Sequence, residues 1–462
     1  MAFVEVAAST LDDAYEISNS LRLNDGDGPK LQITTGSTGD RRQFTFSCWF
    51  KLAQNTGDDQ TLFSCNDGGH LGHIRINSAM SLNVQISASG SDVVTTNRLF
   101  RDYSAWNHLV VAQDTEQGTA ANRLKIYVNG VLETSFSAAA YTDQNTDTSW
   151  NSNTELCLGR DVNGDDNPFD GYIAEAFWID GTQYAASDFG KFNDNGVWVP
   201  IDAKPNITFG THGFYFEFKQ TGTSQNSSGI GADTSGQDNH YAVTNLAAAD
   251  ITIDTPTNNF CILNSLHKST SNVVLSEGNL KAVLDQSTGW QHAAGTIAVK
   301  NGKWYWEAKA LSVAATDKTS IGVFQFDTTD VDFVNVTNTD RSSKGLSGHG
   351  AGTGSYAYAQ GEIVMCGMDL DNNKVYWGKD GTWFGSLDPA AGSGSTTQTI
   401  SNANFCVPAV GGYGTSSWEL NFGVPQFSIS SGNADANGYG NFEFAVPSGF
   451  YALCTKNLAE YG

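Results

Sequence analysis

The chain has 462 residues and a formal net charge of −24 at pH 7, because 49 acidic residues outnumber 25 basic ones. Glycine is abundant, with 49 residues, aromatic residues reach 11 %, and charged residues make up 16 %, below the roughly 25 % of an ordinary soluble protein. The aromatic content excludes disorder. Because the chain is strongly acidic, it is not expected to bind nucleic acid through phosphate contacts. The length suggests two or three domains.

The first 20 residues carry the clearest helix-start signal in the sequence. Ser9 or Thr10 would cap the first turn, and Asp12 and Asp13 would lie at the positive end of its dipole. Because the segment is short, a loosely ordered terminus is the alternative interpretation. We predict that residues 1–20 form an N-terminal attachment segment.

Residues 21–219 show short alternating strands separated by glycine, asparagine and aspartate turns. In 42–52 (RQFTFSCWFKL), apolar and polar side chains alternate as they do in a half-buried strand. Asn129-Gly130 separates two alternating runs, which is a strong hairpin signal. Strands at this spacing predict an antiparallel β-sandwich.

Residues 220–259 are rich in serine, threonine, glycine and asparagine, and we predict a polar connector there, with the alternative that Tyr241, Val243 and Leu246 hold part of it in place. Strand patterns resume in 260–462, where Asp380-Gly381 marks a further hairpin. The final stretch, 440–462, is apolar enough to pack against this second sandwich. The predicted fold is therefore all-β, with two antiparallel sandwiches in tandem.

Export and membrane signals are missing from the sequence. No stretch approaches 18 consecutive apolar residues, so we expect no membrane insertion. The N-terminal residues lack the basic and apolar regions of a signal peptide, which predicts synthesis in a cytoplasm. The seven cysteines form no C-x-x-C pair and lie mostly in apolar runs, so buried free thiols are expected, with a disulfide such as Cys48–Cys65 as the alternative.

Five blocks of the first half occur in the order found in laminin-G-like domains: 44–50 (FTFSCWF), 106–110 (WNHLV), 124–130 (LKIYVNG), 158–160 (LGR) and 169–175 (FDGYIAE). This half resembles the laminin-G-like, concanavalin A-like jelly roll. The resemblance implies the same sandwich that the strand pattern predicts.

The second half is similar to SPRY domains. The blocks that carry this resemblance are 302–307 (GKWYWE), 321–323 (IGV), 369–377 (DLDNNKVYW), 378–383 (GKDGTW), 408–410 (PAV) and 421–423 (NFG). The resemblance implies a SPRY-like sandwich over 260–462.

The joined order of both halves, with the stretches 231–239, 254–264 and 447–458 between and after them, resembles virion proteins of tailed bacteriophages, particularly marine ones. This implies a virion-surface protein, such as a tail or head fibre, made in the host cytoplasm. Its implied partners are other virion subunits and a host-surface glycan or protein. A homo-oligomer is also implied, with a trimer as one arrangement, although no heptad or collagen-like run supports it. A structural decoration or connector protein is the alternative.

No motif with a catalytic mechanism is found. Glycan-cutting enzymes of the concanavalin-like fold share an E-x-D-x-x-E strand with paired carboxylates about 5 Å apart, which this chain lacks. Glu175 and Asp180 are five residues apart, on opposite faces of a regular strand. G-x-S-x-G and H-E-x-x-H are also missing. We expect no enzyme, and a glycan-degrading appendage is the weakest of the three functions considered.

One acidic loop alternates oxygen-bearing side chains, namely Asp161, Asn163, Asp165 and Asn167. Ca²⁺ prefers about six to eight oxygen ligands, so these residues are the candidate calcium site. Against this, Asp166 stands where an EF-hand loop has glycine, and Tyr172 where it has a bidentate glutamate. A solvated acidic turn is the alternative interpretation.

Flat aromatic rings beside polar groups are typical of sugar-binding surfaces. The candidate ligand-binding residues of this kind are Trp150, Trp290, Tyr356, Tyr358 and Trp383. Each has the alternative of a core position, because aromatic residues are enriched on buried sheet faces. By analogy with SPRY domains, the loops 343–358 and 383–386 form the predicted binding surface.

Overall fold

A computed structural model gives the architecture of the chain. It describes residues 15–68, 70–86, 92–162, 164, 166–313, 319–326, 343–348, 358–394, 400 and 405–462. Strands hold 45 % of the residues and helices 6 %, which confirms the all-β fold class. Residues 1–14, most of the predicted attachment segment, lie outside the described residues.

The chain divides into two compact units, one formed by Leu11–Thr257 and the other mainly by Asn258–Gly462. Each unit is described by itself below. Among the described residues, no helix is long and apolar enough to cross a membrane. All seven cysteines are buried and free, as expected.

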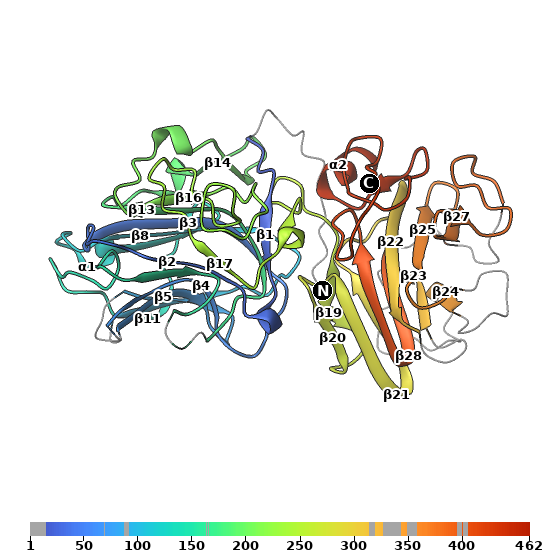
Figure 1. Cartoon of the computed structure of the whole chain (residues 1–462), viewed down its shortest axis with the longest axis horizontal. Helices are drawn as coiled ribbons and strands as arrows, with labels where there is room; N and C mark the ends of the chain where they lie inside the picture. The colour runs from blue at the N-terminus through green and yellow to red at the C-terminus, as the bar shows by residue number, and fades with distance from the viewer. Residues whose placement is uncertain are drawn as a thin grey trace. The chain divides into compact units, whose positions relative to one another are not determined.

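The first unit is a sandwich of two antiparallel layers, which Figure 1 shows stacked on one another. In hydrogen-bonded order, the first layer holds β10 (Val131–Leu132), β9 (Leu124–Val128), β8 (Asn107–Asp114), β3 (Gln43–Leu52), β13 (Gly171–Asp180), β1 (Ser20–Leu23) and β18 (Ile251–Thr252), with β16 (Phe214–Phe216) on β13. The second holds β11 (Phe136–Ala139), β7 (Val93–Leu99), β6 (Ser81–Gln85), β5 (His70–Ile76), β4 (Gln60–Asp67), β12 (Glu155–Leu158), β2 (Lys30–Thr34) and β17 (Ala242–Thr244).

The core of this sandwich follows from the alternation of its strands. In β3, every second side chain from Phe44 to Leu52 is buried between the layers. The ring of Phe46 stacks on that of Phe63 from the opposite layer, with centroids 5.0 Å apart. Asn129 and Gly130 both have positive φ in the turn between β9 and β10, which confirms the predicted hairpin.

Strand β13 carries a bulge at Glu175, where the register with β3 shifts and φ is +46°. Ala174 and Phe177 pack in hydrophobic clusters on the outer face of the first layer, which faces away from the second layer. Ala176 instead packs in the core between the two layers. Glu175 is therefore on the outer face, and Asp180 follows the alternation of Ala176 toward the inner side. The two carboxylates lie on opposite faces, but the bulge means that the regular strand assumed in the prediction is not formed.

The outer face of the first layer is covered by the segment that follows β13. This segment contains η2 (Ala186–Asp188), β14 (Gly190–Phe192), β15 (Trp198–Pro200) and η3 (Lys204–Asn206). Phe189, Ile207 and Phe209 bury their side chains against Phe177 and Tyr215. The other helices of the unit are α1 (Ala120–Arg123), η1 (Asp25–Asp27) and η4 (Ala248–Asp250).

The segment predicted as a connector is built into the first unit up to Thr257. Its strand β17 pairs with β2, and β18 pairs with β1. Tyr241 is fully buried, and Arg22 forms an ion pair with Asp250 at 3.2 Å. Paired backbone and buried side chains fix this stretch, although its composition is that of a flexible linker.

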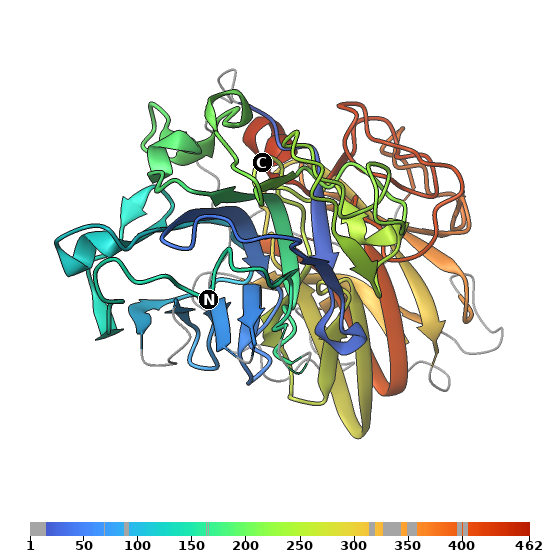
Figure 2. The ribbon, with the colours of Figure 1, turned by 60° about the vertical axis from the view of Figure 1, so that its left-hand side comes forward.

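The second unit is one antiparallel sheet, to which β29 (Tyr451–Ala452) adds in parallel on β22. Figures 1 and 2 both show its long strands β21 and β28 side by side. The hydrogen-bonded order is β19 (Leu263–Lys268), β21 (Lys281–Gly295), β28 (Phe405–Asn421), β22 (Lys303–Ser312), β25 (Ile363–Asp369), β26 (Lys374–Lys379) and β27 (Thr382–Trp383). Beside this path lie β20 (Val273–Ser276), β23 (Thr319–Phe326) and β24 (Ser343–Gly348), and α2 (Thr455–Tyr461) ends the chain.

Two buried carboxylates fix the loops of the second unit. Glu307, in β22, accepts hydrogen bonds from the Tyr305 hydroxyl and from the backbone N–H groups of Glu443 and Phe444. Asp435 accepts one from the Asn457 amide at 2.7 Å, which ties down the C-terminal segment. The acidic residue of the GKWYWE block is therefore a structural anchor.

Candidate functional site

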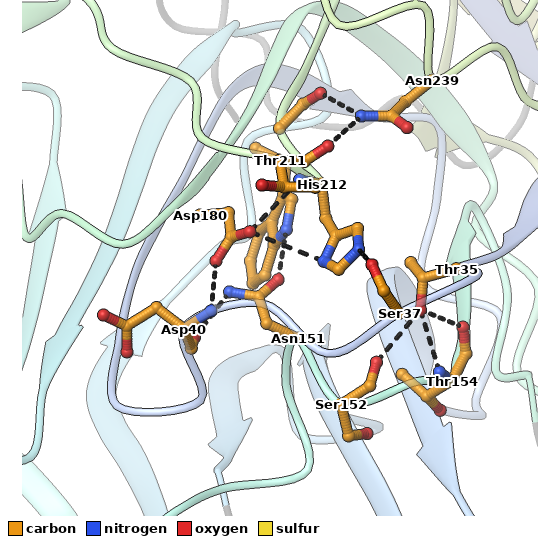
Figure 3. Close-up of polar contacts among 12 residues, drawn as sticks. Thr35, Ser37, Asp40, Asn151, Ser152, Thr154, Asp180, Thr211, His212 and Asn239 are labelled. Carbon is orange, nitrogen blue, oxygen red and sulfur yellow. Dashed lines mark hydrogen bonds and ion pairs between the residues drawn. The ribbon is translucent and has the colours of Figure 1, made fainter.

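Loops from distant parts of the first unit meet around Asp180, at the end of β13 (Figure 3). Its Oδ1 accepts the backbone N–H of Asp40 at 2.7 Å, and its Oδ2 accepts that of His212 at 3.2 Å. Only 7 % of Asp180 is exposed. A Cβ atom at Gly39 would collide with this carboxylate, so glycine is required where the loop passes it.

Asn151 extends this frame from a third loop. Its amide donates to the carbonyl of Asp40 at 2.9 Å, and its Oδ1 accepts the indole N–H of Trp178 at 2.9 Å. Its own carbonyl accepts the N–H of Gly39 at 2.8 Å. The β2–β3 loop is therefore held at Gly39 and Asp40 by the buried Asn151 and Asp180.

His212 lies between Asp180 and Ser37 (Figure 3). Its Nε2 is 3.1 Å from the Ser37 hydroxyl, and its Nδ1 is 3.5 Å from Asp180 Oδ2. The Asn239 amide donates to the carbonyls of both neighbours of His212, Thr211 and Gly213, at 2.9 Å each. We call Ser37, Asp40, Asn151, Asp180, His212 and Asn239 the polar loop end.

Asn239 is the last residue of the stretch 231–239, and Asp233 organises that stretch. The Asp233 carboxylate accepts the backbone N–H groups of Tyr215, Ser235 and Asn239. A block that carries the bacteriophage resemblance is thus a hydrogen-bonded loop, which holds Asn239 against the backbone on either side of His212.

The surface of the polar loop end is exposed and polar. Ser37, Thr38, Asp40, Thr211 and 236–238 are exposed around the buried His212 and Asp180. Exposed polar groups on loops that a rigid scaffold positions are typical of ligand-binding surfaces.

Of the four candidate calcium residues, the structure describes Asp161 and Asn167. Asp161 is 2 % exposed, and its oxygens accept hydrogen bonds from Thr61 at 2.7 Å and Asn167 at 2.6 Å. The Arg75 guanidinium is 3.7 Å from the same carboxylate. Asn163 and Asp165 lie outside the described residues, and within the described ones no cluster of three His, Cys, Asp or Glu side chains could hold a metal.

Asp161 is expected to stabilise the fold independently of calcium. Asp161→Ala should lower the free energy of unfolding by about 1–3 kcal/mol, because the buried Thr61 hydroxyl and the Asn167 amide lose their acceptor. Denaturant titrations in calcium and in EGTA measure this loss, with Asp166→Ala, at an exposed residue of the same loop, as the control. A loss seen in calcium alone would contradict this expectation and favour the calcium site.

The five aromatic residues predicted to bind a ligand differ in their exposure and in whether the structure describes them. Trp150 and Tyr358 are buried, at 0 % and 1 % exposure, so neither can offer a ring face to a ligand. Trp150 packs on Phe44, Phe63 and Trp178, in the core between the layers.

The other platform candidates are in the second unit. Tyr356 lies outside the described residues, as does most of 343–358, and Trp290 is in β21 with an undescribed side chain. Trp383, in β27, is partly exposed, with its ring centroid 6.4 Å from that of Tyr305. It stays a candidate ligand contact.

Glu175 is a buried carboxylate on the outer face of the first unit. Its Oε1 accepts hydrogen bonds from the hydroxyls of Tyr15 at 2.5 Å and Tyr215 at 2.6 Å. Burial raises the pKa of Glu175 from 4.5 to about 7, although both tyrosine hydrogen bonds lower it. At 5 % exposure, this carboxylate lies beneath the covering segment, away from the loop surface.

The pKa of Glu175 predicts a pH dependence of stability. The folded chain keeps this proton up to about pH 7, whereas the unfolded chain releases it near 4.5, so the stabilisation is complete below pH 4.5 and is lost as the pH rises to 7. Glu175→Gln should abolish that decline, which amounts to about 3 kcal/mol because each pKa unit corresponds to about 1.4 kcal/mol. Melting temperatures measured between about pH 5 and pH 8 test this, and parallel profiles for both proteins would contradict it.

Residues 25–183 match the model of a family described as the concanavalin A-like lectin/glucanases superfamily. The first unit has the concanavalin A-like fold. The matched range contains Ser37 and Asp180 but ends before His212. The description includes both lectins and glucanases, so it covers binding proteins and enzymes alike.

Two solved structures that match part of this chain are distant from it in sequence. The SPRY domain of human HERC1 is 13 % identical, with 34 % of this chain and 96 % of that chain covered and a TM-score of 0.25. A heptameric SAP-like pentraxin from Limulus polyphemus is 16 % identical, with 37 % and 80 % covered and a TM-score of 0.28. No curated protein matches this chain.

Proposed function

We propose that this chain is a bacteriophage virion-surface protein, of the tail or head fibre type, that binds a host-surface ligand through the polar loop end. The observation that carries the binding role is the buried frame around Asp180, which fixes three loops while their polar side chains stay exposed. The bacteriophage setting rests on the sequence resemblance over nearly the whole chain.

The frame favours binding because its loops are already ordered. Ordering flexible loops on association weakens binding. Here the hydrogen bonds of Asp180, Asn151 and Asn239 order the loops when the chain folds, so this loss of binding free energy is avoided. Hydroxyl, amide and carboxylate groups at such a surface match the hydrogen-bonding groups of sugars and of polar protein loops.

The negative charge of the protein favours some classes of ligand over others. Asp40 and Asp238 are exposed at the polar loop end, and the chain as a whole carries a formal charge of −24. Like charges repel, so a strongly anionic polysaccharide is disfavoured. We propose a neutral, hydroxyl-rich glycan as the preferred ligand.

A second role, contact with other virion subunits, is favoured by an apolar surface on the β14–β15 hairpin. Phe192 and Val197 are 51 % and 52 % exposed, and the Phe192 ring lies 5.0 Å from that of Trp198. Exposed apolar side chains that neighbour one another are typical of protein–protein contacts.

An array of bacterial surface polysaccharides tests the ligand class. The labelled full chain is expected to bind neutral glycans saturably and to bind anionic ones at least about tenfold more weakly. Binding to purified particles that lack the protein, with no binding to any glycan, would favour the structural role instead.

A further inference from the structure

We infer from the arrangement of Ser37, His212 and Asp180 that the polar loop end hydrolyses carboxylic esters, with Ser37 as the nucleophile. This activity goes beyond the proposed binding function and does not depend on it. The structure offers the three groups that acyl transfer by a serine requires: a hydroxyl, a base within hydrogen-bond reach, and a group that orients the base.

The nucleophile and base are in contact. Ser37 is exposed, so an ester can reach its hydroxyl, and Oγ lies 3.1 Å from His212 Nε2. The Ser37 hydroxyl donates to Nε2 when the imidazole proton is on Nδ1. A carboxylate beside Nδ1 favours that tautomer, because an Nδ1 lone pair would be repelled by its charge.

Asp180 supplies this carboxylate. His212 is 5 % exposed, its Nδ1 makes no other hydrogen bond among the described residues, and Asp180 Oδ2 is 3.5 Å away. This distance is longer than a hydrogen bond, as is common in catalytic sites without substrate. The backbone N–H groups of Asp40 and His212 hold the carboxylate in place.

Backbone donors for the developing oxyanion are also present. The N–H groups of Ser37 and Thr38 donate no hydrogen bond within the described part of the chain, and both residues are exposed. A backbone N–H at or next to the nucleophile can stabilise the negative oxygen of a tetrahedral intermediate.

The reaction balances with water as co-substrate. Ser37 Oγ bonds to the acyl carbon as its proton passes to His212 Nε2, and the ester C–O bond then breaks as that proton passes to the leaving alcohol. A water molecule attacks the acyl-serine, gives its proton to Nε2, and Ser37 leaves with that proton. The products are a carboxylic acid and an alcohol.

Asn239 is a positioning residue, because it holds the backbone on both sides of His212. Asn239→Ala is expected to lower kcat for p-nitrophenyl acetate while KM changes little. A purely structural role would show instead as equal loss of folded protein, with kcat per folded molecule unchanged.

A fluorophosphonate probe and p-nitrophenyl acetate test the inference on the full chain. The chain is expected to be labelled at Ser37, and Ser37→Ala to abolish labelling and to lower hydrolysis at least about 100-fold. Ser37→Ala should keep its melting temperature, because the side chain is exposed. Ser78→Ala, at another exposed serine, should retain both activities. A wild-type chain that is not labelled, or that hydrolyses the ester no faster than Ser37→Ala, overturns the inference.

Discussion

Replacing Lys51 with methionine is expected to lower the free energy of unfolding by about 3–5 kcal/mol. Lys51 Nζ lies 2.5 Å from Asp254 Oδ2, and both side chains are fully buried in the first unit. The indole of Trp106 also donates to Asp254, at 3.3 Å. The variant would remove the Lys51 charge from a fully buried carboxylate, which is among the most destabilising single changes in a protein. Denaturant unfolding followed by tryptophan fluorescence measures the loss.

Two further variants separate charge burial from other effects. The double variant Lys51→Met/Asp254→Leu should recover part of the loss, because apolar side chains then replace both charges. Lys219→Met, at a lysine that is 53 % exposed and paired with Glu217, should cost less than about 1 kcal/mol. Equal losses at Lys51 and Lys219 would refute the role of the buried pair.

Asp180→Ala is expected to lower the free energy of unfolding by about 2–4 kcal/mol, because the N–H groups of Asp40 and His212 lose their buried acceptor. The same change should release the loops of the polar loop end. Hydrogen exchange of the amides of 36–40 and 209–213 is therefore expected to become faster, while that of the β3 core stays slow.

The matched control for this prediction is Asp58→Ala. Asp58 is exposed in the loop after β3, at the sandwich end opposite the loop that precedes β3. Its replacement should change stability by less than about 0.5 kcal/mol. If Asp180→Ala left the exchange of 36–40 and 209–213 unchanged, Asp180 would not be the anchor of these loops.

Much of the fold could be predicted because alternation is a local property of a strand. The side chains of β3 from Phe44 to Leu52 follow the expected pattern, and Asn129-Gly130 forms the expected turn. The bulge at Glu175 could not be predicted in this way. It requires a positive φ at a non-glycine residue, which contacts from Tyr15 and Tyr215 support.

Composition misled the prediction for residues 220–259. Serine, glycine and asparagine are common in flexible linkers, but they also form tight turns whose side chains hydrogen-bond to the backbone. Asp233 and Asn239 act in the second way. The pairing of β17 and β18 depends on strands more than 200 residues away in the sequence. For example, the hydroxyls of Ser20 and Thr252, which are 232 residues apart, form a hydrogen bond.

The candidate site shows the limit of motif spacing. Four alternating oxygen side chains predict a calcium site, but their spacing does not reveal that Arg75, in β5, lies 3.7 Å from Asp161. Ser37 and His212 are separated by 175 residues and carry no local motif. Their meeting is set by how loops close one end of the sandwich, which no short sequence pattern encodes.

Binding of the labelled chain to a panel of marine bacterial isolates tests most directly whether the polar loop end is the functional surface. Three proteins are compared: wild type, Asp238→Arg at the polar loop end, and Asp58→Arg at the opposite end of the sandwich. Asp238 and Asp58 are both exposed, so the two variants match in charge and size. We predict saturable binding of wild type and Asp58→Arg to the same isolates, and at least about tenfold weaker binding of Asp238→Arg. Equal binding of all three proteins, or no saturable binding to any isolate, would contradict the account.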